Sequence, residues 1–403
     1  MLQKYINFLE NDEHPLLGPT LWGLSKWGIW MPKSNLSAKI YCAIHIIATL
    51  FVFSQFVELW LIRSDLDLAL RNLSVTMLST ICTIKAGTFI IRHENWKDIL
   101  EYVSKLEKEQ LLKNDKITNR IINEYKKYSR RVTYFYWCLV AATVLTVVLA
   151  PLLAFWSSEE YRGNIREGLT AYPEIMSSWL PFDRTKGLGY WASVVEHVLI
   201  CVYGGGVIAT YDTNAVVLMN FFAGQLKLLN VNCSRLFSSD KKNIDKHNNK
   251  ILSIKELLTH HLSLTRYAKI LDDQLSPVMF LYVIVCSLMI CSSAIQLTKE
   301  GTTSMQRIWL AEYLVAIITQ LFLYCWHSNE VLIMSIEADR GIYYSGWWRQ
   351  NVRLRRCVLI LAGRLRKTFV FSAGPFTKLN LATFIAILKG AYSYYTILSN
   401  KDN

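Results

Sequence analysis

The chain has 403 residues, 52% of them hydrophobic, and a formal net charge of +13. A soluble protein of this length usually consists of two or three domains with polar linkers, but here apolar stretches long enough to span a membrane recur along the chain. This composition excludes an ordinary soluble globular protein and predicts a membrane protein with several spans.

The first 35 residues are expected to form a cytoplasmic N-terminal segment. Their beginning, MLQKYINFLENDEHP, has no sustained apolar core and carries acidic residues early, unlike a cleavable signal peptide. The first span is therefore expected to act as its own insertion signal.

Seven apolar stretches are long enough to cross a bilayer as helices. In chain order they are residues 36–62, 66–91, 132–156, 190–222, 277–297, 308–326 and 379–400. The third contains CLVAATVLTVVLAPLLAFW, which has no charge in 19 residues. The second span is weakened by Lys85, whose ammonium is expected to extend to the inner interface, and the fourth contains Glu196 and Asp212.

The spans and the stretches between them divide the chain into six segments. These are residues 1–35; residues 36–222 with spans 1 to 4; residues 223–276, a cytoplasmic loop and a helix entering span 5; residues 277–326 with spans 5 and 6; residues 327–378, a cytoplasmic anchor segment; and residues 379–403 with span 7 and a short extracellular tail. The predicted fold is an all-α membrane protein of seven transmembrane helices with a cytoplasmic helical anchor domain.

The basic residues alternate from one connection to the next. Residues 92–131 hold 11 Lys and Arg, and residues 223–276 and 327–378 hold 9 each, whereas residues 157–189 hold only four against five acids. The positive-inside rule then places the basic connections and the N-terminus in the cytoplasm, and the C-terminus outside. This orientation is opposite to that of a G-protein-coupled receptor. The same alternation explains the net charge without a nucleic-acid partner.

The fourth span contains three consecutive glycines, at positions 204 to 206, in YGGGVIATYD. Together they weaken a helix by about 3 kcal/mol relative to alanine. They predict either a kink with close helix packing or a ligand that approaches thin backbone.

Neither a catalytic motif nor a metal-binding motif is evident in the sequence. The Walker, H-E-x-x-H, G-x-S-x-G and C-x-x-C patterns are all missing. The nine cysteines suggest no disulfide framework. We expect no catalytic residues, no metal and no cofactor.

The last span, LNLATFIAILKGAYSYYTILSN, carries polar residues that lipid would not favour. One stripe of the helix includes Gly390, Ser393, Tyr394, Ile397 and Asn400, and the opposite stripe is bulky and apolar. A polar stripe interrupted by one aliphatic residue is expected of a helix that lines a water-filled pore with a dewetting gate. The alternative is a helix packed in its own bundle, with hydroxyls bonding across helices.

Motifs in the last third of the chain resemble those of the insect odorant receptors. QLFLYCWHSNEVL is similar to the sixth span of that family, and IYYSGWW to its Tyr-x-x-x-Trp motif. RLRKTFVFSAGPF and LATFIAILKGAYSYYTIL are similar to the stretches that end the family's chains, and HLSLTRYAKILDDQLS to the segment that enters span 5. Arg366, Thr368 and Pro375 depart from the family's usual residues before the last helix.

The resemblance implies a ligand-tuning subunit of a ligand-gated, non-selective cation channel in the plasma membrane of olfactory sensory neurons. Such subunits assemble with a co-receptor into a heterotetramer, within membrane lipid, and the last helix lines a central pore. The ligand would be a small volatile odorant bound in the outer half of the spans. A gustatory-type receptor or another seven-span membrane protein is the alternative, although SYYTILSN does not match the gustatory ending.

Two sets of site residues are predicted from helical spacing and from the resemblance. The expected ligand-binding residues are Leu73, Met77, Thr143, Val147, Ala150, Val194, His197 and Cys201. The expected pore and gate residues are Gly390, Ser393, Tyr394, Ile397, Asn400 and Lys401, with Ile397 as the gate and Lys401 at the outer exit.

Overall fold

The computed structural model describes residues 9–32, 34–157, 159–166, 172, 174–181, 187–237, 246–298 and 304–399. Over these residues the chain is almost wholly helical, and its one regular sheet is the antiparallel pair β1 (Ser372–Ala373) and β2 (Thr377–Lys378). The helices are α2 (Gly18–Lys26), α3 (Asn35–Leu61), α4 (Leu66–Ile91), α5 (His93–Leu112), α6 (Lys116–Ser157), α7 (Glu159–Arg166), α8 (Gly187–Ser234), α9 (Lys246–Thr298), α10 (Ser304–Glu337), α11 (Arg340–Tyr343), the 3-10 helix η1 (Trp347–Arg349), α12 (Val352–Leu365) and α13 (Leu381–Ser399).

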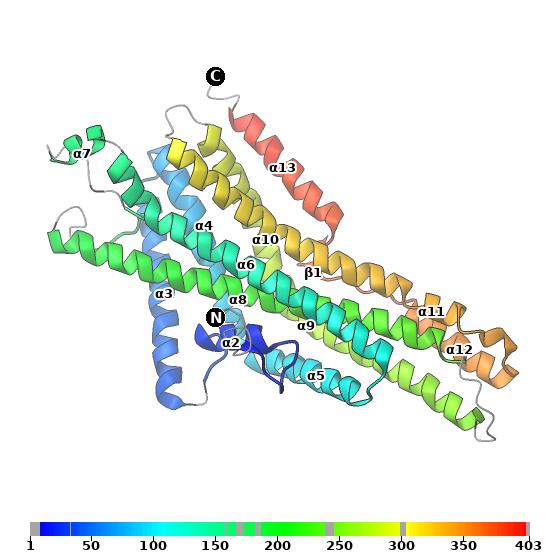
Figure 1. The fold of residues 1–403 in the computed structure, drawn as a ribbon. Helices are drawn as coiled ribbons and strands as arrows, with labels where there is room; N and C mark the ends of the chain where they lie inside the picture. Colours follow the sequence, from blue (N-terminus) through cyan, green and yellow to red (C-terminus); the bar gives the residue numbers. More distant parts are fainter. Residues whose placement is uncertain are drawn as a thin grey trace.

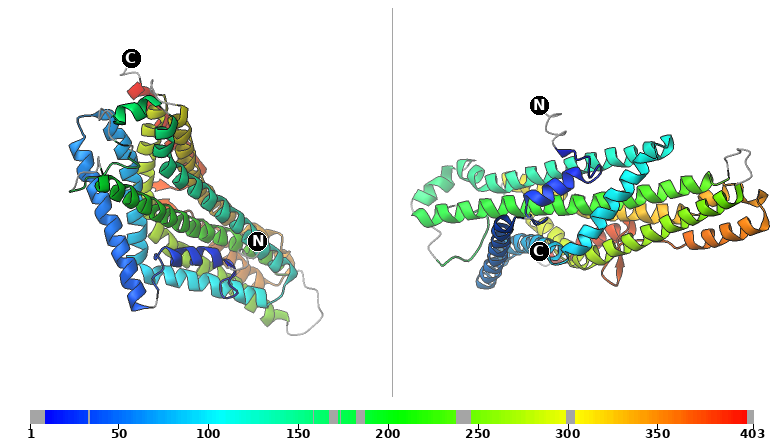
Figure 2. Two further views of the ribbon diagram at one scale, coloured as in Figure 1. Left: turned by 60° about the vertical axis from the view of Figure 1, so that its left-hand side comes forward. Right: turned by 90° about the horizontal axis from the view of Figure 1, so that it is seen from below.

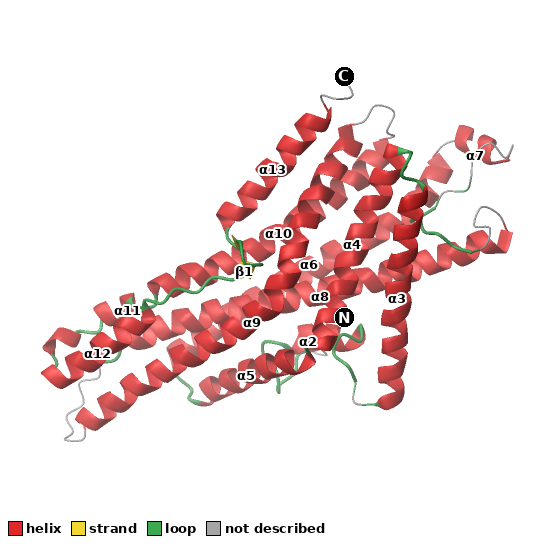
Figure 3. Cartoon of the chain, turned by 180° about the vertical axis from the view of Figure 1, so that it is seen from behind, coloured by secondary structure: helices red, strands yellow, loops and turns green. Residues whose placement is uncertain are grey.

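Four long helices, α6, α8, α9 and α10, run along the molecule and give it an elongated shape (Figures 1 and 2). Helices α3, α4 and α13 lie beside one end of these four, and α11 and α12 lie at the other end (Figures 1 and 3). The chain is thus one continuous bundle with a wide part and a narrower extension.

Six of the described helices are long and apolar enough to cross a membrane, which confirms a multi-pass, all-helical protein. They are Asn35–Leu61, Asn72–Ile91, Lys116–Leu149, Gly187–Ser234, Ser253–Leu297 and Arg307–Arg349. Helix α13 corresponds to the predicted seventh stretch and lies along α9 and α10 (Figure 1). A count of seven spans and the orientation of the termini stay predictions.

Helices α8, α9 and α10 continue well past the ends of the predicted apolar stretches. The extensions of α8 and α9 pack with α11 and α12 around a second core that includes Leu229, Leu257, Ile342 and Val358. On α9, buried residues recur at helical spacing outside the apolar run, for example at Leu264, so packing continues the helix there. The predicted segment boundaries at 222, 276 and 326 therefore fall inside continuous helices.

The N-terminal segment, residues 9–32, packs on α5 and α6. Arg130 of α6 donates a hydrogen bond from Nε to the Glu10 carboxylate at 2.9 Å and another from its guanidinium to the Leu16 carbonyl. The Leu16 amide in turn donates to Oε2 of the buried Glu107 of α5, at 3.0 Å. These contacts hold the segment against α5 and against the part of α6 that precedes the third span.

Candidate ligand cavity and pore helix

A cavity of about 150 Å³ lies between α3, α4, α6, α8 and α10. Its lining residues are Ala48, Val52, Val75, Leu78, Ser79, Cys82, Thr83, Tyr136, Leu139, Val140, Thr143, Val144, Val147, Met176, Ile200, Cys201, Tyr203, Gly204, Gly205, Ile208, Tyr313, Ala316, Ile317 and Gln320. On each of α4, α6 and α8 they recur every three or four residues, so each helix turns one stripe toward the cavity. Most of these side chains are apolar, which suits a small apolar ligand.

The glycines of α8 allow close helix packing and form part of the cavity wall. A Cβ on Gly205 would lie 2.5 Å from Cγ2 of Val144, and a Cβ on Gly206 would clash with the ring of Trp27. Close packing against α6 and the N-terminal segment therefore requires glycine at these two positions. Gly204 and Gly205 also form part of the cavity wall, so backbone faces the cavity there.

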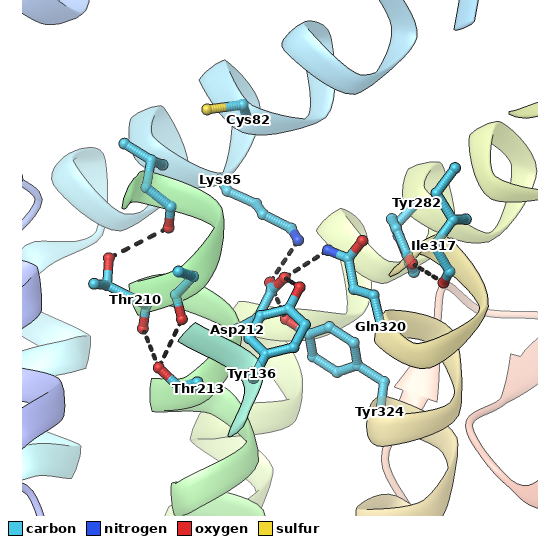
Figure 4. A network of polar contacts seen from close by, with 12 residues as sticks. Cys82, Lys85, Tyr136, Thr210, Asp212, Thr213, Tyr282, Ile317, Gln320 and Tyr324 are labelled. Atoms are coloured by element: carbon cyan, nitrogen blue, oxygen red, sulfur yellow. Dashed lines mark hydrogen bonds and ion pairs between the residues drawn. The ribbon is translucent and has the colours of Figure 1, made fainter. Parts of the chain in front are cut away.

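A buried polar network lies directly beside the cavity, centred on Asp212 of α8 (Figure 4). Its carboxylate accepts hydrogen bonds from Lys85 Nζ at 2.5 Å, from Tyr324 at 2.6 Å, from Gln320 Nε2 at 2.5 Å and from Tyr136 at 2.9 Å. Tyr136 and Gln320 also line the cavity. The network thus joins four helices, α4, α6, α8 and α10, at one wall of the cavity.

The expectation that Lys85 extends to the membrane interface was wrong. Its side chain is fully buried, forms an ion pair with Asp212, and has three tyrosine rings around its ammonium. The ring centroids of Tyr282, Tyr211 and Tyr324 lie 5.1, 5.6 and 5.7 Å from Nζ. The Asp212 carboxylate and the three aromatic rings offset the desolvation cost of the buried Lys85 ammonium, so the side chain does not need to extend to water.

The predicted ligand-binding residues fall into two groups. Thr143, Val147 and Cys201 line the cavity, whereas Leu73, Met77, Val194 and His197 do not appear among the lining residues. His197 is buried near the start of α8, and its Nε2 lies 3.0 Å from the Ser178 hydroxyl. Ala150 lies in α6, one turn beyond Val147. Whether any of them binds a ligand stays a prediction.

The predicted ligand-binding residues lie on α4, α6 and α8, three of the five helices around the cavity, and do not include several of the lining residues. On α4 the cavity-facing stripe contains Val75, Ser79 and Cys82 rather than Leu73 and Met77. Gln320 of α10 was also missed. A polar residue inside an apolar span usually faces protein or water, and this signal could have identified it.

Helix α13 turns its two stripes in opposite directions. Phe384, Ile387 and Leu388 pack on the core of the chain, and Ala391 is buried. Tyr394 and Ile397 are 62% and 64% exposed.

Gly390 and Ser393 share the exposed stripe of α13. A Cβ on Gly390 would meet nothing within 4 Å, and the Ser393 hydroxyl donates to the Lys389 carbonyl of its own helix. The described part of the stripe is therefore not packed in its own bundle. Asn400 and Lys401 lie outside the described residues.

Metal binding finds no support in the described part of the chain. No group of three or more His, Cys, Asp or Glu side chains there is placed to hold a metal ion.

Comparison with known proteins places this membrane protein among receptors. A family model described as 7tm Odorant receptor matches residues 65–392. Odorant receptor 82a of Drosophila melanogaster is 21% identical over 342 residues, which cover 84% of this chain and 86% of that receptor. Odorant receptor Or2 of Anopheles gambiae is 26% identical over 150 residues, which span only 37% of this chain and 39% of that relative.

Solved structures have the same fold. The insect olfactory receptor OR5 of Machilis hrabei, in complex with eugenol, superimposes with a TM-score of 0.81 at 18% identity, over 97% of this chain and all of that one. A structure of the same receptor reported without mention of a ligand gives a TM-score of 0.78 at 17% identity, over 98% of each chain. Because the family model covers most of the sequence, the chain belongs to the 7tm odorant receptor family. This is a family of receptors, not of enzymes.

Proposed function

We propose that this chain is the ligand-tuning subunit of an odorant-gated, non-selective cation channel in the plasma membrane of olfactory sensory neurons. The observation that carries the proposal is the apolar cavity of about 150 Å³ lined by five helices. An apolar cavity of about this size holds a molecule as large as benzene. The ligand is then a volatile of about six to ten heavy atoms, which limits its affinity to the millimolar to micromolar range.

Helix α10 provides a route from the cavity to the pore helix. Gln320 faces the cavity from α10, and Phe322, two residues further on, packs edge-on against Phe384 of α13 with ring centroids 5.5 Å apart. Cavity and pore helix therefore contact opposite sides of the same turn of α10. A ligand that favours one position of α10 would shift the position of α13 by differential binding.

The exposed stripe of α13 supports a pore shared between subunits. One chain supplies one such helix, so Gly390, Ser393, Tyr394 and Ile397 would face a central channel only in an oligomer. We place Ile397 at the gate, because a narrow ring that contains isoleucine excludes water until the helices part. By the charge alternation, the N-terminus is cytoplasmic and the C-terminus extracellular, with Asn400 and Lys401 at the outer mouth.

The extension of the bundle offers a surface for the partner subunits. Leu359 and Ile360 of α12 are 56% and 64% exposed, and Tyr343, Tyr344 and Trp348 nearby are also exposed. Exposed large apolar side chains outside the apolar spans are typical of an interface between proteins. We assign this surface to assembly with the co-receptor in a heterotetramer, while lipid covers the apolar outer faces of the spans.

Co-expression with the co-receptor tests this function. A panel of small volatiles should evoke inward cation current, and Val147→Trp, which fills the cavity from α6, should abolish or retune it. Leu145→Trp is the matched control, because Leu145 lies on the same helix and faces outward, 59% exposed. Surface-expressed channels that give no current to any volatile, or that respond equally with Val147→Trp, would contradict the proposal.

A further inference from the structure

The walls of the cavity are poor in hydrogen-bond donors, because the protein itself uses them. Thr83 donates to the Thr80 carbonyl at 2.9 Å and Thr143 to the Leu139 carbonyl at 2.9 Å, both within their own helices. Tyr136 donates to Asp212. Each of these hydroxyl groups keeps acceptor lone pairs but has no proton left for a ligand.

Tyr203 is used in the same way, which follows from the bonds of His45. Nε2 of His45 lies 3.1 Å from the Gly28 carbonyl, which can only accept, so Nε2 carries the proton in the neutral ring. Nδ1 is then an acceptor, and the Tyr203 hydroxyl donates a hydrogen bond to it at 2.5 Å. Among the described lining residues, Ser79 has the one hydroxyl for which no bond is found, and Cys201 offers only a weak thiol donor.

Gln320 lines this donor-poor space, and the orientation of its side-chain amide is fixed. A carboxylate oxygen of Asp212 can bond only to the amide nitrogen of Gln320, at 2.5 Å, so the assignment of the two amide ends is determined. Oε1 consequently points away from Asp212 (Figure 4). Within the part of the chain that the structure describes, Oε1 accepts no hydrogen bond.

The orientation of this acceptor is unusually well fixed. Asp212 is itself held by Lys85, Tyr136 and Tyr324, so rotation of the Gln320 amide would break a bond to a buried carboxylate and turn its NH₂ group away from it. An acceptor that cannot turn to present a donor discriminates between ligands that differ only in the direction of the hydrogen bond.

We propose that the cavity selects volatiles that carry a hydroxyl donor, namely small alcohols or phenols, and that Gln320 Oε1 is the specificity-determining acceptor. This inference rests on the proposed receptor function. A hydroxyl ligand satisfies Oε1, whereas an aldehyde or a hydrocarbon of equal size leaves it without a partner. Aldehydes, which only accept, would depend on the single hydroxyl of Ser79.

Two sets of size-matched ligands test the inference on the receptor co-expressed with the co-receptor. They are benzyl alcohol, benzaldehyde and ethylbenzene, and the linear compounds hexanol, hexanal and heptane. In the wild-type channel each alcohol should activate at a concentration about tenfold lower than its aldehyde or hydrocarbon partner. This comparison needs no variant and so does not depend on a variant's folding.

Gln320→Met then assigns the preference to one residue. Methionine has a similar volume and no acceptor carbonyl, so the alcohol preference should fall to about twofold or less while the hydrocarbon response persists. Gln225→Met is the control, because Gln225 is also fully buried and bonded to a glutamine, Gln110, but lies away from the cavity. It should keep the wild-type preference.

The possible outcomes distinguish a failure of this inference from a failure of the proposed function. Equal responses to the three members of a set in the wild type, or an alcohol preference retained in a responsive Gln320→Met channel, would overturn the inference alone. Surface-expressed wild-type channels that respond to no member of either set and to no other volatile would overturn the proposed function and the inference with it.

Discussion

Nζ of Lys85 lies 2.5 Å from Oδ1 of Asp212, and the two residues join α4 to α8 across 127 positions of sequence. The pair is buried, and its carboxylate also accepts hydrogen bonds from Tyr136, Gln320 and Tyr324. A single ion pair therefore underlies the arrangement of four helices beside the cavity. Its removal is expected to disturb folding and ligand response together.

Removing one charge of this pair should destabilise the protein more than removing both charges. Lys85→Met leaves an uncompensated carboxylate, and loss of one partner of a buried pair typically costs about 3–5 kcal/mol. Lys85→Met combined with Asp212→Asn removes both charges, and the asparagine can still accept hydrogen bonds. Surface expression of the double variant should exceed that of Lys85→Met alone.

Arg120→Met provides the control for this comparison. Arg120 pairs with Glu124 on the exposed surface of α6, and such pairs contribute about 1 kcal/mol or less. Its surface expression should stay near the wild-type level. A double variant that expresses no better than Lys85→Met would show that the charge pairing is not what matters at this site.

Glu107 should make the docking of the N-terminal segment depend on pH. Burial raises the pKa of Glu107 from 4.5 to about 7, although the Leu16 amide, Lys126 and Arg130 oppose the shift. The pKa of Glu107 is higher in the folded than in the unfolded state, so its protonated form favours folding. This contribution to the free energy of unfolding is fully present below about pH 4.5 and is lost as the pH rises through about 7. It is worth on the order of 3 kcal/mol.

Thermal unfolding of the purified protein between about pH 5 and pH 8 measures this effect. The wild type should lose stability as the pH rises, and Glu107→Gln should flatten the profile. Glu124→Gln, at an exposed carboxylate, should leave the profile unchanged. A wild-type stability that increases over the same range would contradict the assigned direction of the pKa shift.

Ile397→Ser should raise the current that flows without ligand. Serine removes the bulky apolar group from the exposed stripe of α13, so a narrow pore would stay wet. Whole-cell recording of the co-expressed channel measures it. Ile385→Ser is the control, since Ile385 is also exposed but lies about 120° around the helix from Ile397. Equal basal currents for both variants would place the gate on another element.

Charge on the exposed face of α12 should weaken assembly. Ile360→Asp adds a carboxylate to the apolar surface at the end of the bundle, so less co-receptor should co-purify with this chain. Size-exclusion chromatography of the complex measures the loss. Arg356→Ala, at an exposed charged position of the same helix, should have little effect. Intact tetramers with Ile360→Asp would exclude this face from the subunit contacts.

The boundaries of the apolar helices were predictable because hydrophobic length reports directly on them. The stretch 66–91 coincides with α4, and 379–400 differs from α13 by two residues at its start and one at its end. The extensions of α8, α9 and α10 were harder to predict, because outside the apolar run a packed helix and a surface loop share a mixed composition. A helix that enters span 5 from the preceding connection was predicted, and it corresponds to the extension of α9.

The cavity and its polar wall were only partly predictable. Several stripes of α4 have similar composition, so the sequence alone does not reveal whether Met77 or Leu78 lines the cavity. The pairing of Lys85 with Asp212 depends on contacts between distant segments. Both residues were noticed as charges in apolar spans, but only the folded bundle brings them together.

The structure of the complex with its co-receptor, determined with an activating volatile bound, would show whether this cavity is the ligand site. We expect ligand density between α4, α6, α8 and α10, in contact with Val147 and Cys201 and with Gln320 at the polar end of the cavity. Ligand density elsewhere, with this cavity unchanged and empty in the activated channel, would contradict this expectation.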